Sequence, residues 1–431
     1  MRSAHPIHSP AQMLERLAGI PGGPELLDQA QRREDVALIG GAVRDLLLGH
    51  WPRELDVTVA ADAAGLAREL AAAVSPSERA YGRTVEPVLH ERFRTASVGW
   101  SYGRIDIAER RAESYPAPGA LPVVRPGSVE EDLARRDFTV NAISLPLHGA
   151  ENEGLVSVEG ALEDLRAGRL RVLHERSFLD DPTRLLRLAR YAARLGFEIE
   201  PHTRELAQRA IAEGALGTVS GARAGAELWL AAREPTARQA FAVLDSLGVA
   251  AALGLPTPFD DELAAAAEAL LPGDGERDLL LLALALRAAE DEPDEVVLAR
   301  MSRLEMPAQL AKRLLGPTGV AGLAARLEAA RGAGEAYALL DGLPVEAVAV
   351  AGALAARTNP AAAEHAREWL SSQRHVALSI DGSDLLAAGV PEGPEVGARL
   401  DAALRRKREG ALPTREHELR FALDEQAEEQ A

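Results

Sequence analysis

Cysteine is absent from this chain, and aromatic residues and lysine are scarce. Without cysteine among its 431 residues, the protein has no disulfide, no thiol nucleophile and no zinc–thiolate site, which fits a reducing compartment. Aromatic residues make up 4% of the chain, so few side chains are available to stack on bases. Lysine occurs only at Lys312 and Lys407, and arginine therefore carries nearly all of the positive charge.

Long apolar runs are also absent. Residues 1–17 contain no apolar segment of the kind found in a signal peptide, and nowhere do about twenty apolar residues follow one another. We therefore expect a cytoplasmic protein with no membrane partner. No feature of the sequence indicates an obligate protein partner.

The net charge of −18 by itself argues against a nucleic-acid partner. A local basic surface nevertheless suffices to bind phosphates on an acidic protein. Hydrophobic residues make up 47% of the chain, and a chain of this length is expected to form two or more domains.

The hydrophobic pattern predicts an α/β region followed by a helical one. A helix is expected at 61–74, and short apolar runs between turn residues predict strands at 36–40, 55–59, 95–99 and 104–108. Residues 111–130 are rich in proline and glycine and are expected to form a mobile loop over the site. From about residue 155 onward the pattern is almost wholly helical.

The most informative segment runs from residue 36 to residue 56. An apolar run ends at Gly40 and Gly41, a short helical stretch with Arg44 follows, and Glu54 and Asp56 then flank one leucine. Because glycine has no Cβ, the backbone here can approach phosphate oxygens, and the N-terminus of the following helix attracts them. The segment predicts a nucleoside triphosphate site; the alternative is a strand, a turn and an amphipathic helix without a ligand.

The two carboxylates predict a metal site. Side chains at positions i and i+2 of a strand face the same side, so Glu54 and Asp56 are the predicted metal ligands for two-metal phosphoryl transfer. Oxygen ligands suit Mg²⁺ and equally accept Mn²⁺. Asp106, on the strand predicted at 104–108, either completes the catalytic set or is a solvent-facing residue of an edge strand.

The second motif, RRDFTVNA, begins at Arg135 and Arg136. Arginine is permanently charged and binds phosphate oxygens in pairs, so these two residues are predicted to bind the triphosphate. Asp137 and Asn141 are predicted to bind the ribose or to orient an arginine. The alternative is a charged helix end that leads into a strand.

The third motif, at 178–197, begins with two aspartates and carries a row of arginines. Asp181 before Pro182 predicts a helix with aspartate as its N-cap and proline at its first position. Arginines at steps of three and four lie along one face of this helix, where they either face solvent or contact phosphates: Arg184, Arg187, Arg190 and Arg194.

In this order, the motifs GGAVRDLLLG…ELD, RRDFTVNA and DDPTRLLRLARYAARLGF resemble those of class II nucleotidyltransferases. This family comprises the bacterial and eukaryotic tRNA nucleotidyltransferases (CCA-adding enzymes) and the bacterial poly(A) polymerases. The resemblance spans nearly the whole chain. It implies an α/β nucleotidyltransferase head like that of polymerase β, followed by an all-α neck, body and tail that clamp tRNA.

The resemblance also implies a division of the chain and roles for its motifs. We expect an N-terminal helical segment at 1–35, a head at 36–150, a neck with the base-reading motif at 151–245, a body at 246–370 and a tRNA-contacting tail at 371–431. The metal-binding acidic pair of the family falls on Glu54 and Asp56. Its RRDFT motif, which would contact the incoming nucleotide, falls on Arg135–Thr139.

The family motif EDxxR, a protein template for CTP and ATP, falls on Asp180, Asp181 and Arg184. A carboxylate accepts from the exocyclic amine of cytosine or adenine, and a guanidinium donates to the neighbouring ring acceptors, whereas the keto edges of U and G fit less well. Two positions depart from the family pattern. Asp180 replaces the usual Glu, and Glu54 replaces the usual Asp, which shifts that carboxylate by about 1 Å.

We therefore expect a Mg²⁺-dependent, template-independent nucleotidyltransferase that adds CMP and AMP to the 3′ end of tRNA, with tRNA, CTP and ATP as partners. The expected catalytic set is Glu54, Asp56 and Asp106. The residues expected to bind the nucleotide are Gly40, Gly41, Arg44, Arg135, Arg136, Asp137, Asn141, Asp181, Arg184 and Arg187. The residues expected to contact RNA are Arg190, Arg194, Arg405, Arg406, Lys407 and Arg408.

Four alternatives remain open. Relatives that add only CC, only the terminal A, or long A tails share these motifs, so the motifs do not separate those activities. A non-catalytic RNA-binding homologue is the fourth alternative, and it is motivated by Glu54 and by the net acidity of the chain.

Overall fold

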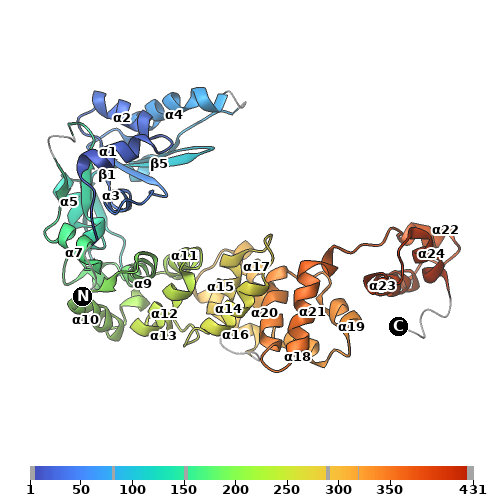
Figure 1. Ribbon diagram of the computed structural model, residues 1–431. Coiled ribbons are helices and arrows are strands. Elements are labelled where there is room, and N and C mark those ends of the chain that lie inside the picture. The colour runs from blue at the N-terminus through green and yellow to red at the C-terminus, as the bar shows by residue number, and fades with distance from the viewer. Residues whose placement is uncertain (1–4, 80–82, 150–153, 288–291, 319, 425–431) are drawn as a thin grey trace. The chain divides into compact units, whose positions relative to one another are not determined.

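The computed structural model describes residues 5–79, 83–149, 154–287, 292–318 and 320–424. The chain forms two compact units (Figure 1). The first comprises Met1–Ser220 and Ser246–Leu253, and the second comprises Gly221–Asp245 and Gly254–Ala431. All the strands described belong to the first unit.

The first unit is built on a seven-stranded sheet with the strand order β3-β4-β5-β2-β1-β8-β9. Neighbouring strands are antiparallel except β2 and β5, which run parallel. The strands are β1 Ala37–Ile39, β2 Leu55–Val59, β3 Val88–His90, β4 Thr95–Trp100, β5 Gly103–Glu109, β8 Ile143–Pro146 and β9 Val156–Ser157.

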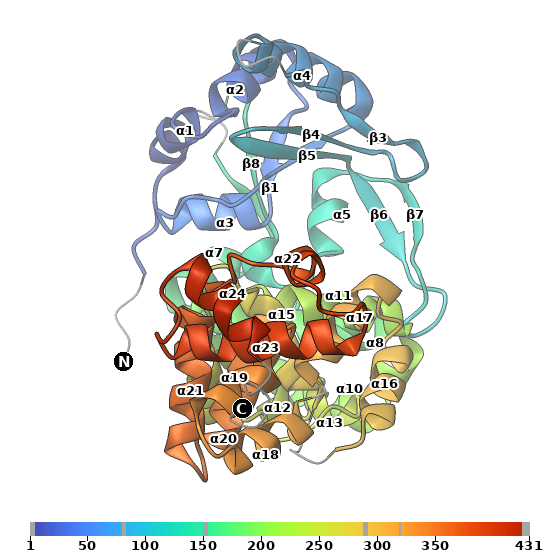
Figure 2. The same ribbon diagram turned by 90° about the vertical axis from the view of Figure 1, so that its right-hand side faces the viewer.

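Helices cover this sheet. The helix α2 packs on α4, and α4 packs on β4 and β5 (Figure 2). In the central strand β2 every residue is buried except Asp56, which keeps partial exposure. The strand therefore holds this one carboxylate at the edge of an apolar core. The helices of this region are α1 Pro10–Ala18, α2 Gly23–Arg32, α3 Gly41–Leu47 and α4 Ala63–Arg79.

The prediction of a mobile loop at 111–130 is wrong. Two strands, β6 Arg111–Ser114 and β7 Val123–Pro126, pair as an antiparallel hairpin, and the helix α5 Val129–Ala134 follows. The β-branched pair Val123-Val124 favours extended backbone. The proline and glycine residues that suggested a loop lie mostly in the connection between the two strands.

The tip of this hairpin is anchored. Gly119 has a φ of +69°, and its N–H donates to the carbonyl oxygen of Leu179 at 3.0 Å. A Cβ at this glycine would lie 2.0 Å from Thr218 Oγ1, so a larger residue does not fit here. The connection therefore contacts the segment that directly precedes Asp180.

The rest of the first unit is mainly helical. The helix α9 begins at Thr183, after the short helix α8 Ser177–Asp180. A small parallel pair of strands, β10 and β11, flanks these helices. The remaining elements are η1 Glu91–Phe93, η2 Thr139–Asn141, α7 Ala161–Ala167, β10 Arg169–Leu170, α9 Thr183–Leu195, β11 Glu198–Ile199, α10 Pro201–Ala212, η3 Ala215–Thr218 and α13 Val249–Ala252.

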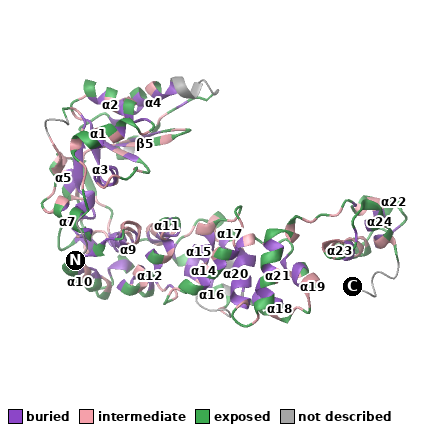
Figure 3. Ribbon diagram, in the orientation of Figure 1, coloured by how far each residue is buried: buried purple, intermediate pink, exposed green. Residues whose placement is uncertain are grey.

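In the second unit every described element is a helix. Its centre is α20 Val345–Ala355, which is buried from Glu346 to Ala355 and packs against α14, α18 and α21 (Figure 3). The elements are α11 Gly221–Ala232, α12 Ala237–Leu247, α14 Asp261–Leu270, α15 Arg277–Leu286, α16 Asp294–Arg303, α17 Ala308–Thr318, α18 Ala321–Ala329, α19 Ala333–Leu340, α21 Pro360–Ser371, η4 Gln373–His375, α22 Gly382–Ala387, α23 Pro394–Arg408 and α24 Arg415–Leu423.

The last three helices enclose a small core of their own around Leu385, Ala403 and Ala422. In the described part of the chain, no helix combines the length and apolarity needed to cross a membrane. The prediction of an α/β head followed by a helical region is confirmed by this arrangement of elements. The division of the chain into five segments stays a prediction.

Candidate active site

The glycine pair forms the turn between β1 and α3. Gly40 has φ +70° and ψ −128°, a conformation that residues with a Cβ avoid. A Cβ on Gly40 would lie 2.5 Å from Arg136 Nη1. The missing side chain therefore lets the guanidinium of Arg136 approach the turn where the phosphates are predicted to bind.

Arg44 lies inside the head rather than on its surface. Its side chain is 1% exposed and donates to Asp45 Oδ1 at 2.6 Å and 2.8 Å, and to Asn141 Oδ1 at 2.5 Å. These bonds tie α3 to the end of the RRDFTVNA motif. Contact between Arg44 and a nucleotide stays a prediction.

The predicted catalytic carboxylates come from two adjacent strands. Asp56 on β2 is the register partner of Asp106 on the parallel strand β5, and Glu54 lies in the bend just before β2. Asp106 Oδ1 accepts from Arg104 Nε at 2.9 Å and Nη2 at 2.8 Å. The structure thus places Asp56 and Asp106 side by side on parallel strands.

The surroundings of Asp56 disfavour its charged form. Burial raises the pKa of Asp56 to about 6, and the negative charges of Glu54 and Asp106 add to this shift, although Arg136 and Arg44 oppose it. A divalent cation bound by these carboxylates would relieve both the burial cost and the repulsion. Carboxylate oxygens are the kind of ligand that Mg²⁺ prefers. Among the residues that the structure describes, no group of three or more acidic, histidine or cysteine side chains is arranged to hold a metal ion.

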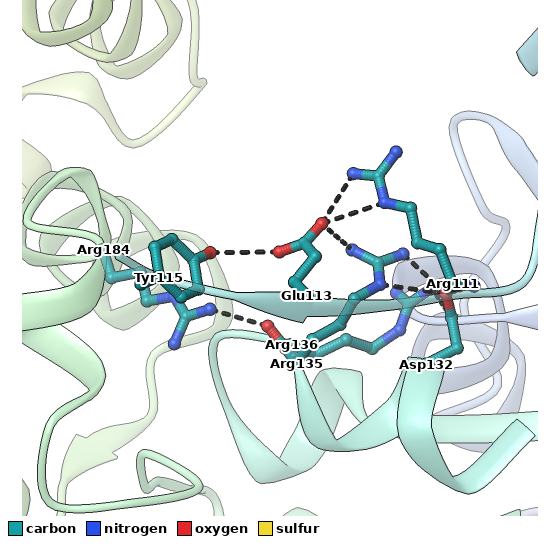
Figure 4. A network of polar contacts seen from close by, with 7 residues as sticks. All are labelled: Arg111, Glu113, Tyr115, Asp132, Arg135, Arg136 and Arg184. Atoms are coloured by element: carbon teal, nitrogen blue, oxygen red, sulfur yellow. Dashed lines mark hydrogen bonds and ion pairs between the residues drawn. The ribbon is translucent and has the colours of Figure 1, made fainter. Parts of the chain in front are cut away.

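Next to the acidic group lies a network of arginines around one buried carboxylate (Figure 4). Asp132, which is fully buried, accepts from Arg135 at 2.7 Å and 2.9 Å and from Arg136 at 3.3 Å. Burial alone would raise the pKa of Asp132, but the two guanidinium groups lower it below its ordinary value. Asp132 therefore stays charged and holds the two arginines of the RRDFT motif in place.

The hairpin contributes two residues that the sequence motifs did not indicate. Glu113 accepts from Arg111 at 2.9 Å and from Arg135 at 3.2 Å, and its other oxygen accepts from the Tyr115 hydroxyl at 3.0 Å (Figure 4). Burial and the charge of Glu113 raise the pKa of Tyr115 to about 12, and the charges of Arg184 and Asp181 also act on this hydroxyl. The neutral phenol therefore lies within electrostatic range of the predicted base-reading pair.

Asp137 and Asn141 orient arginines, one of the two roles predicted for them. Asp137 Oδ2 accepts from Arg187 at 2.7 Å and 2.9 Å, while Asp137 Oδ1 accepts from Asn141 Nδ2 at 3.0 Å. Burial would raise the pKa of Asp137, but Arg187 and the Asn141 hydrogen bond lower it well below its ordinary value. Whether either residue also touches a ribose stays a prediction.

Two of the four arginines of α9, Arg184 and Arg190, are buried, whereas Arg187 and Arg194 keep partial exposure. Arg190 is 7% exposed and its guanidinium lies 4.9 Å from the ring centre of Tyr191. Arg44 and Arg187 approach the same ring at 5.4 Å each. Arg194 pairs with Asp45 at 3.2 Å. The sequence predicted that these arginines face solvent or contact RNA phosphates, and it did not indicate these partners within the protein. RNA contact by Arg190 and Arg194 stays a prediction.

The predicted base-reading pair lies at the junction of α8 and α9. The helix α9 starts one residue later than predicted, because Pro182 takes the N-cap position. Asp181 Oδ1 accepts from the Thr183 N–H at 3.1 Å and from its hydroxyl at 2.6 Å. Arg184, which is 4% exposed, donates to Ser177 Oγ at 2.7 Å and to the carbonyl oxygen of Arg135 at 2.6 Å.

The basic cluster of α23 takes part in ion pairs within the second unit. Arg408 pairs with Asp341 at 2.8 Å, Lys407 with Glu418 at 2.5 Å, and Arg406 with Glu409 at 2.6 Å. The side chain of Arg406 is 49% exposed, whereas that of Arg408 is 4% exposed. Contact between RNA and this cluster, Arg405 included, stays a prediction.

Three supporting residues hold arginines of the motifs but were not among the predicted site residues: Asp45, Asp132 and Glu113. Asp45 lies within the motif GGAVRDLLLG, and Asp132 lies three residues before RRDFTVNA. An acidic residue three positions before an arginine on a helix is a visible signal for Asp132. No comparable signal exists for Glu113, since the hairpin that carries it was not expected.

The chain resembles known proteins in its head and over most of its length. Residues 36–171 match the family model of the poly A polymerase head domain. The chain is 38% identical to the CC-adding tRNA nucleotidyltransferase of Deinococcus radiodurans, over 65% of this chain and 70% of that protein. It is 30% identical to the A-adding tRNA nucleotidyltransferase of Geobacter sulfurreducens, over 90% of this chain and 45% of that protein. The chain spans about half the length of several such relatives.

Solved structures share the fold. A CCA-adding enzyme in an apo form superposes with a TM-score of 0.77 at 26% identity, covering 97% of this chain and 99% of that one. The Thermotoga maritima CCA-adding enzyme complexed with tRNA gives a TM-score of 0.72 at 25% identity, covering 97% and 98%. The head followed by a helical region is therefore common to all three chains.

Proposed function

This chain belongs to the class II tRNA nucleotidyltransferase family, and from this premise we propose that it adds CMP and AMP from CTP and ATP to the 3′ end of tRNA. The observation that carries the proposal is Asp56. Its carboxylate is surrounded by the negative charges of Glu54 and Asp106 and lies within electrostatic range of Arg136. A cation and a triphosphate together would satisfy both sets of charges.

In the proposed reaction the 3′ oxygen of the RNA forms a bond to the α-phosphorus of the nucleotide. The bond between the α- and β-phosphates breaks, and pyrophosphate leaves. Glu54 and Asp56, assisted by Asp106, would hold Mg²⁺. When bound, Mg²⁺ favours deprotonation of the attacking hydroxyl and neutralises the charge of the triphosphate.

The arginines of the RRDFT motif would hold the triphosphate. Asp132 and Glu113 fix Arg135 and Arg136 before any nucleotide arrives, so less ordering is required on binding. Gly40 and Gly41 would bring backbone N–H groups to the phosphates. Asp181 and Arg184 would read the base, since a carboxylate and a guanidinium match the amino edges of cytosine and adenine.

RNA contacts are proposed for two arginines of α9 and for the basic cluster at residues 405–408 of α23. Arg406 carries the most exposed of the ion-paired cationic side chains in the α23 cluster. Arg405, Lys407 and Arg408 would join it, together with Arg190 and Arg194 of α9. Because each phosphate contact releases counterions, binding through these residues would weaken as the salt concentration rises.

Relatives of this chain carry different names, A-adding and CC-adding among them, so the nucleotide specificity needs its own test. We would measure incorporation with CTP, ATP or both on three RNAs: tRNA lacking CCA, tRNA ending in CC, and an oligonucleotide unrelated to tRNA. Addition of CCA to the first RNA, with little extension of the oligonucleotide, is the expected result.

Other patterns would replace this proposal. Incorporation of CMP with no incorporation of AMP on any tRNA would indicate CC addition. Extension only of the CC-ended tRNA would indicate A addition. Long A tails on any RNA would indicate a poly(A) polymerase. Binding of tRNA without incorporation would support the non-catalytic homologue.

A further inference from the structure

The base-reading pair proposed above is held by two buried hydroxyl groups. Ser177 is 0% exposed and Thr183 is 5% exposed. The Ser177 hydroxyl accepts from Arg184, and the Thr183 hydroxyl donates to Asp181. We propose that Ser177 and Thr183 are positioning residues that set the discrimination between amino and keto bases; this inference rests on the proposed function.

The contact of Ser177 determines how Arg184 is oriented. A guanidinium carries five N–H donors, and Arg184 uses one donor on Ser177 Oγ at 2.7 Å and one on the Arg135 carbonyl at 2.6 Å. These two acceptors lie on different segments, α8 and the RRDFT motif. Together they fix the plane of the guanidinium, so its other donors point in set directions.

The contact of Thr183 determines how Asp181 is oriented. Asp181 Oδ1 accepts both the N–H and the hydroxyl of Thr183, at 3.1 Å and 2.6 Å. Two donors on one oxygen restrict rotation of the carboxylate. The orientation of its acceptor edge toward a base would therefore follow from the position of α9, of which Thr183 is the first residue.

One short helix connects the two contacts. The four-residue helix α8 begins at Ser177 and ends at Asp180, directly before Asp181. The Ser177 hydroxyl that holds Arg184 and the backbone that leads into Asp181 thus belong to one helical turn. Because the two readers are set relative to each other, a displacement of about 1 Å in either would misalign hydrogen bonds to the base.

Removing a hydroxyl should therefore change which base is accepted rather than merely how fast the chain works. The variants are Ser177→Ala and Thr183→Val. Two matched controls remove buried hydroxyls elsewhere in the first unit: Ser75→Ala, whose hydroxyl donates to the Ala71 carbonyl, and Thr203→Val, whose hydroxyl donates to Glu200. Thr183→Ser keeps the hydroxyl and serves as the conservative variant.

The measurement is kcat/KM for the nucleotide that the wild-type chain incorporates, CTP or ATP, divided by kcat/KM for UTP or GTP on the same tRNA. We expect this ratio to fall about tenfold or more in Ser177→Ala and Thr183→Val, since a hydrogen bond to a charged group is lost. The ratio should stay unchanged in both controls and in Thr183→Ser. Thermal unfolding of every variant is measured in parallel.

An unchanged ratio in both variants, with rates falling equally for all nucleotides as Tm falls, would reduce the two hydroxyls to a structural role and overturn the inference. If Ser177→Ala does not fold, the comparison of Thr183→Val with Thr183→Ser decides the question. Failure of the wild-type chain to incorporate any nucleotide is a separate result, and it would overturn the proposed function instead.

Discussion

Asp56 and Asp137 lie in the same unit, yet their neighbours shift their pKa values in opposite directions. Burial and two further acidic residues raise the pKa of Asp56 to about 6. Burial would also raise the pKa of Asp137, but Arg187 and Asn141 lower it below its ordinary value. The charges on the acidic side of the site (Glu54, Asp56 and Asp106) are thus compensated only in part, by Arg104 and Arg136. On the arginine side, buried carboxylates pair with the arginines: Asp132 with Arg135 and Arg136, and Asp137 with Arg187.

This difference indicates separate tasks. Carboxylates that repel one another in the absence of a cation bind it more favourably, since binding relieves this repulsion. Groups that position a nucleotide gain from being ordered in advance. On the arginine side, Asp132 and Glu113 order the arginines in advance through their hydrogen bonds.

The sharpest test of the comparison is Asp56→Asn. Loss of one charge at the proposed metal site should lower nucleotide incorporation on the order of 100- to 1,000-fold, while tRNA binding is retained. Incorporation and filter binding of tRNA measure the two effects. Asp28→Asn, at an exposed position of α2, is the control, and an Asp56→Asn protein with full activity would break the comparison.

On the arginine side, Asp132→Asn should act on stability. The fully buried carboxylate pairs with Arg135 and Arg136, and its loss would leave Arg136 without this partner and Arg135 with Glu113 alone. We expect the free energy of unfolding to fall by about 3 kcal/mol. Urea denaturation followed by circular dichroism measures this change. The exposed neighbour Glu130→Gln should have little effect, and equal losses in the two variants would contradict the account.

The hairpin contacts both the RRDFT motif and the segment before Asp180. Its Glu113 bonds to Arg135 and to Tyr115, and its tip, at Gly119, bonds to Leu179. Shortening the connection between β6 and β7 should hurt A addition more than C addition, by about tenfold, because adenine requires a different placement of the readers. Rates with ATP and CTP on matched tRNAs measure this. Equal loss of both activities would count against a role in base choice.

The smallest effect is on pH dependence without metal. Between the ordinary pKa of 3.8 and the folded value of about 6, the folded chain binds more protons at Asp56 than the unfolded chain does. The contribution of Asp56 to stability therefore falls as the pH rises through this window. Asp137, with its lowered pKa, contributes in the opposite sense, and that stability is lost as the pH falls below 3.8.

Thermal unfolding in EDTA across pH 4 to 6.5 measures this dependence (roughly the window set by the two pKa values). Asp56→Asn should remove the fall that the wild-type protein shows. The same fall in the variant would mean that other groups titrate there.

Much of the fold followed from local signals in the sequence. The strand at 55–59 was predicted with the bounds that the structure has, because its apolar residues stand between turn residues. The hairpin was missed, since proline and glycine at its tip concealed two short strands. The start of α9 was predicted one residue early, since the helix begins at Thr183 and Pro182 stands at the N-cap position. The predicted capping role of Asp181 is still seen in its bond to the Thr183 N–H.

The motifs predicted the residues of the site, but not the residues that hold them. Glu113 contacts Arg135, which is distant in the sequence, and no local pattern marks such a pair. The bond between Tyr115 and Glu113 lies within the hairpin that was not predicted, and the bond between Ser177 and Arg184 joins two successive helices. The arginines of α9 illustrate the same limit. Helical spacing predicted one face for Arg190 and Arg194, but it did not indicate that Arg190 is buried beside Tyr191 or that Arg194 pairs with Asp45.

The measurement that tests the central claim most directly uses the wild-type chain, a tRNA lacking its CCA end, labelled CTP and ATP, and Mg²⁺. The account predicts label on the 3′ end of the tRNA, one pyrophosphate released for each nucleotide added, and no product in EDTA. A chain that binds this tRNA but neither transfers label nor releases pyrophosphate would contradict the account.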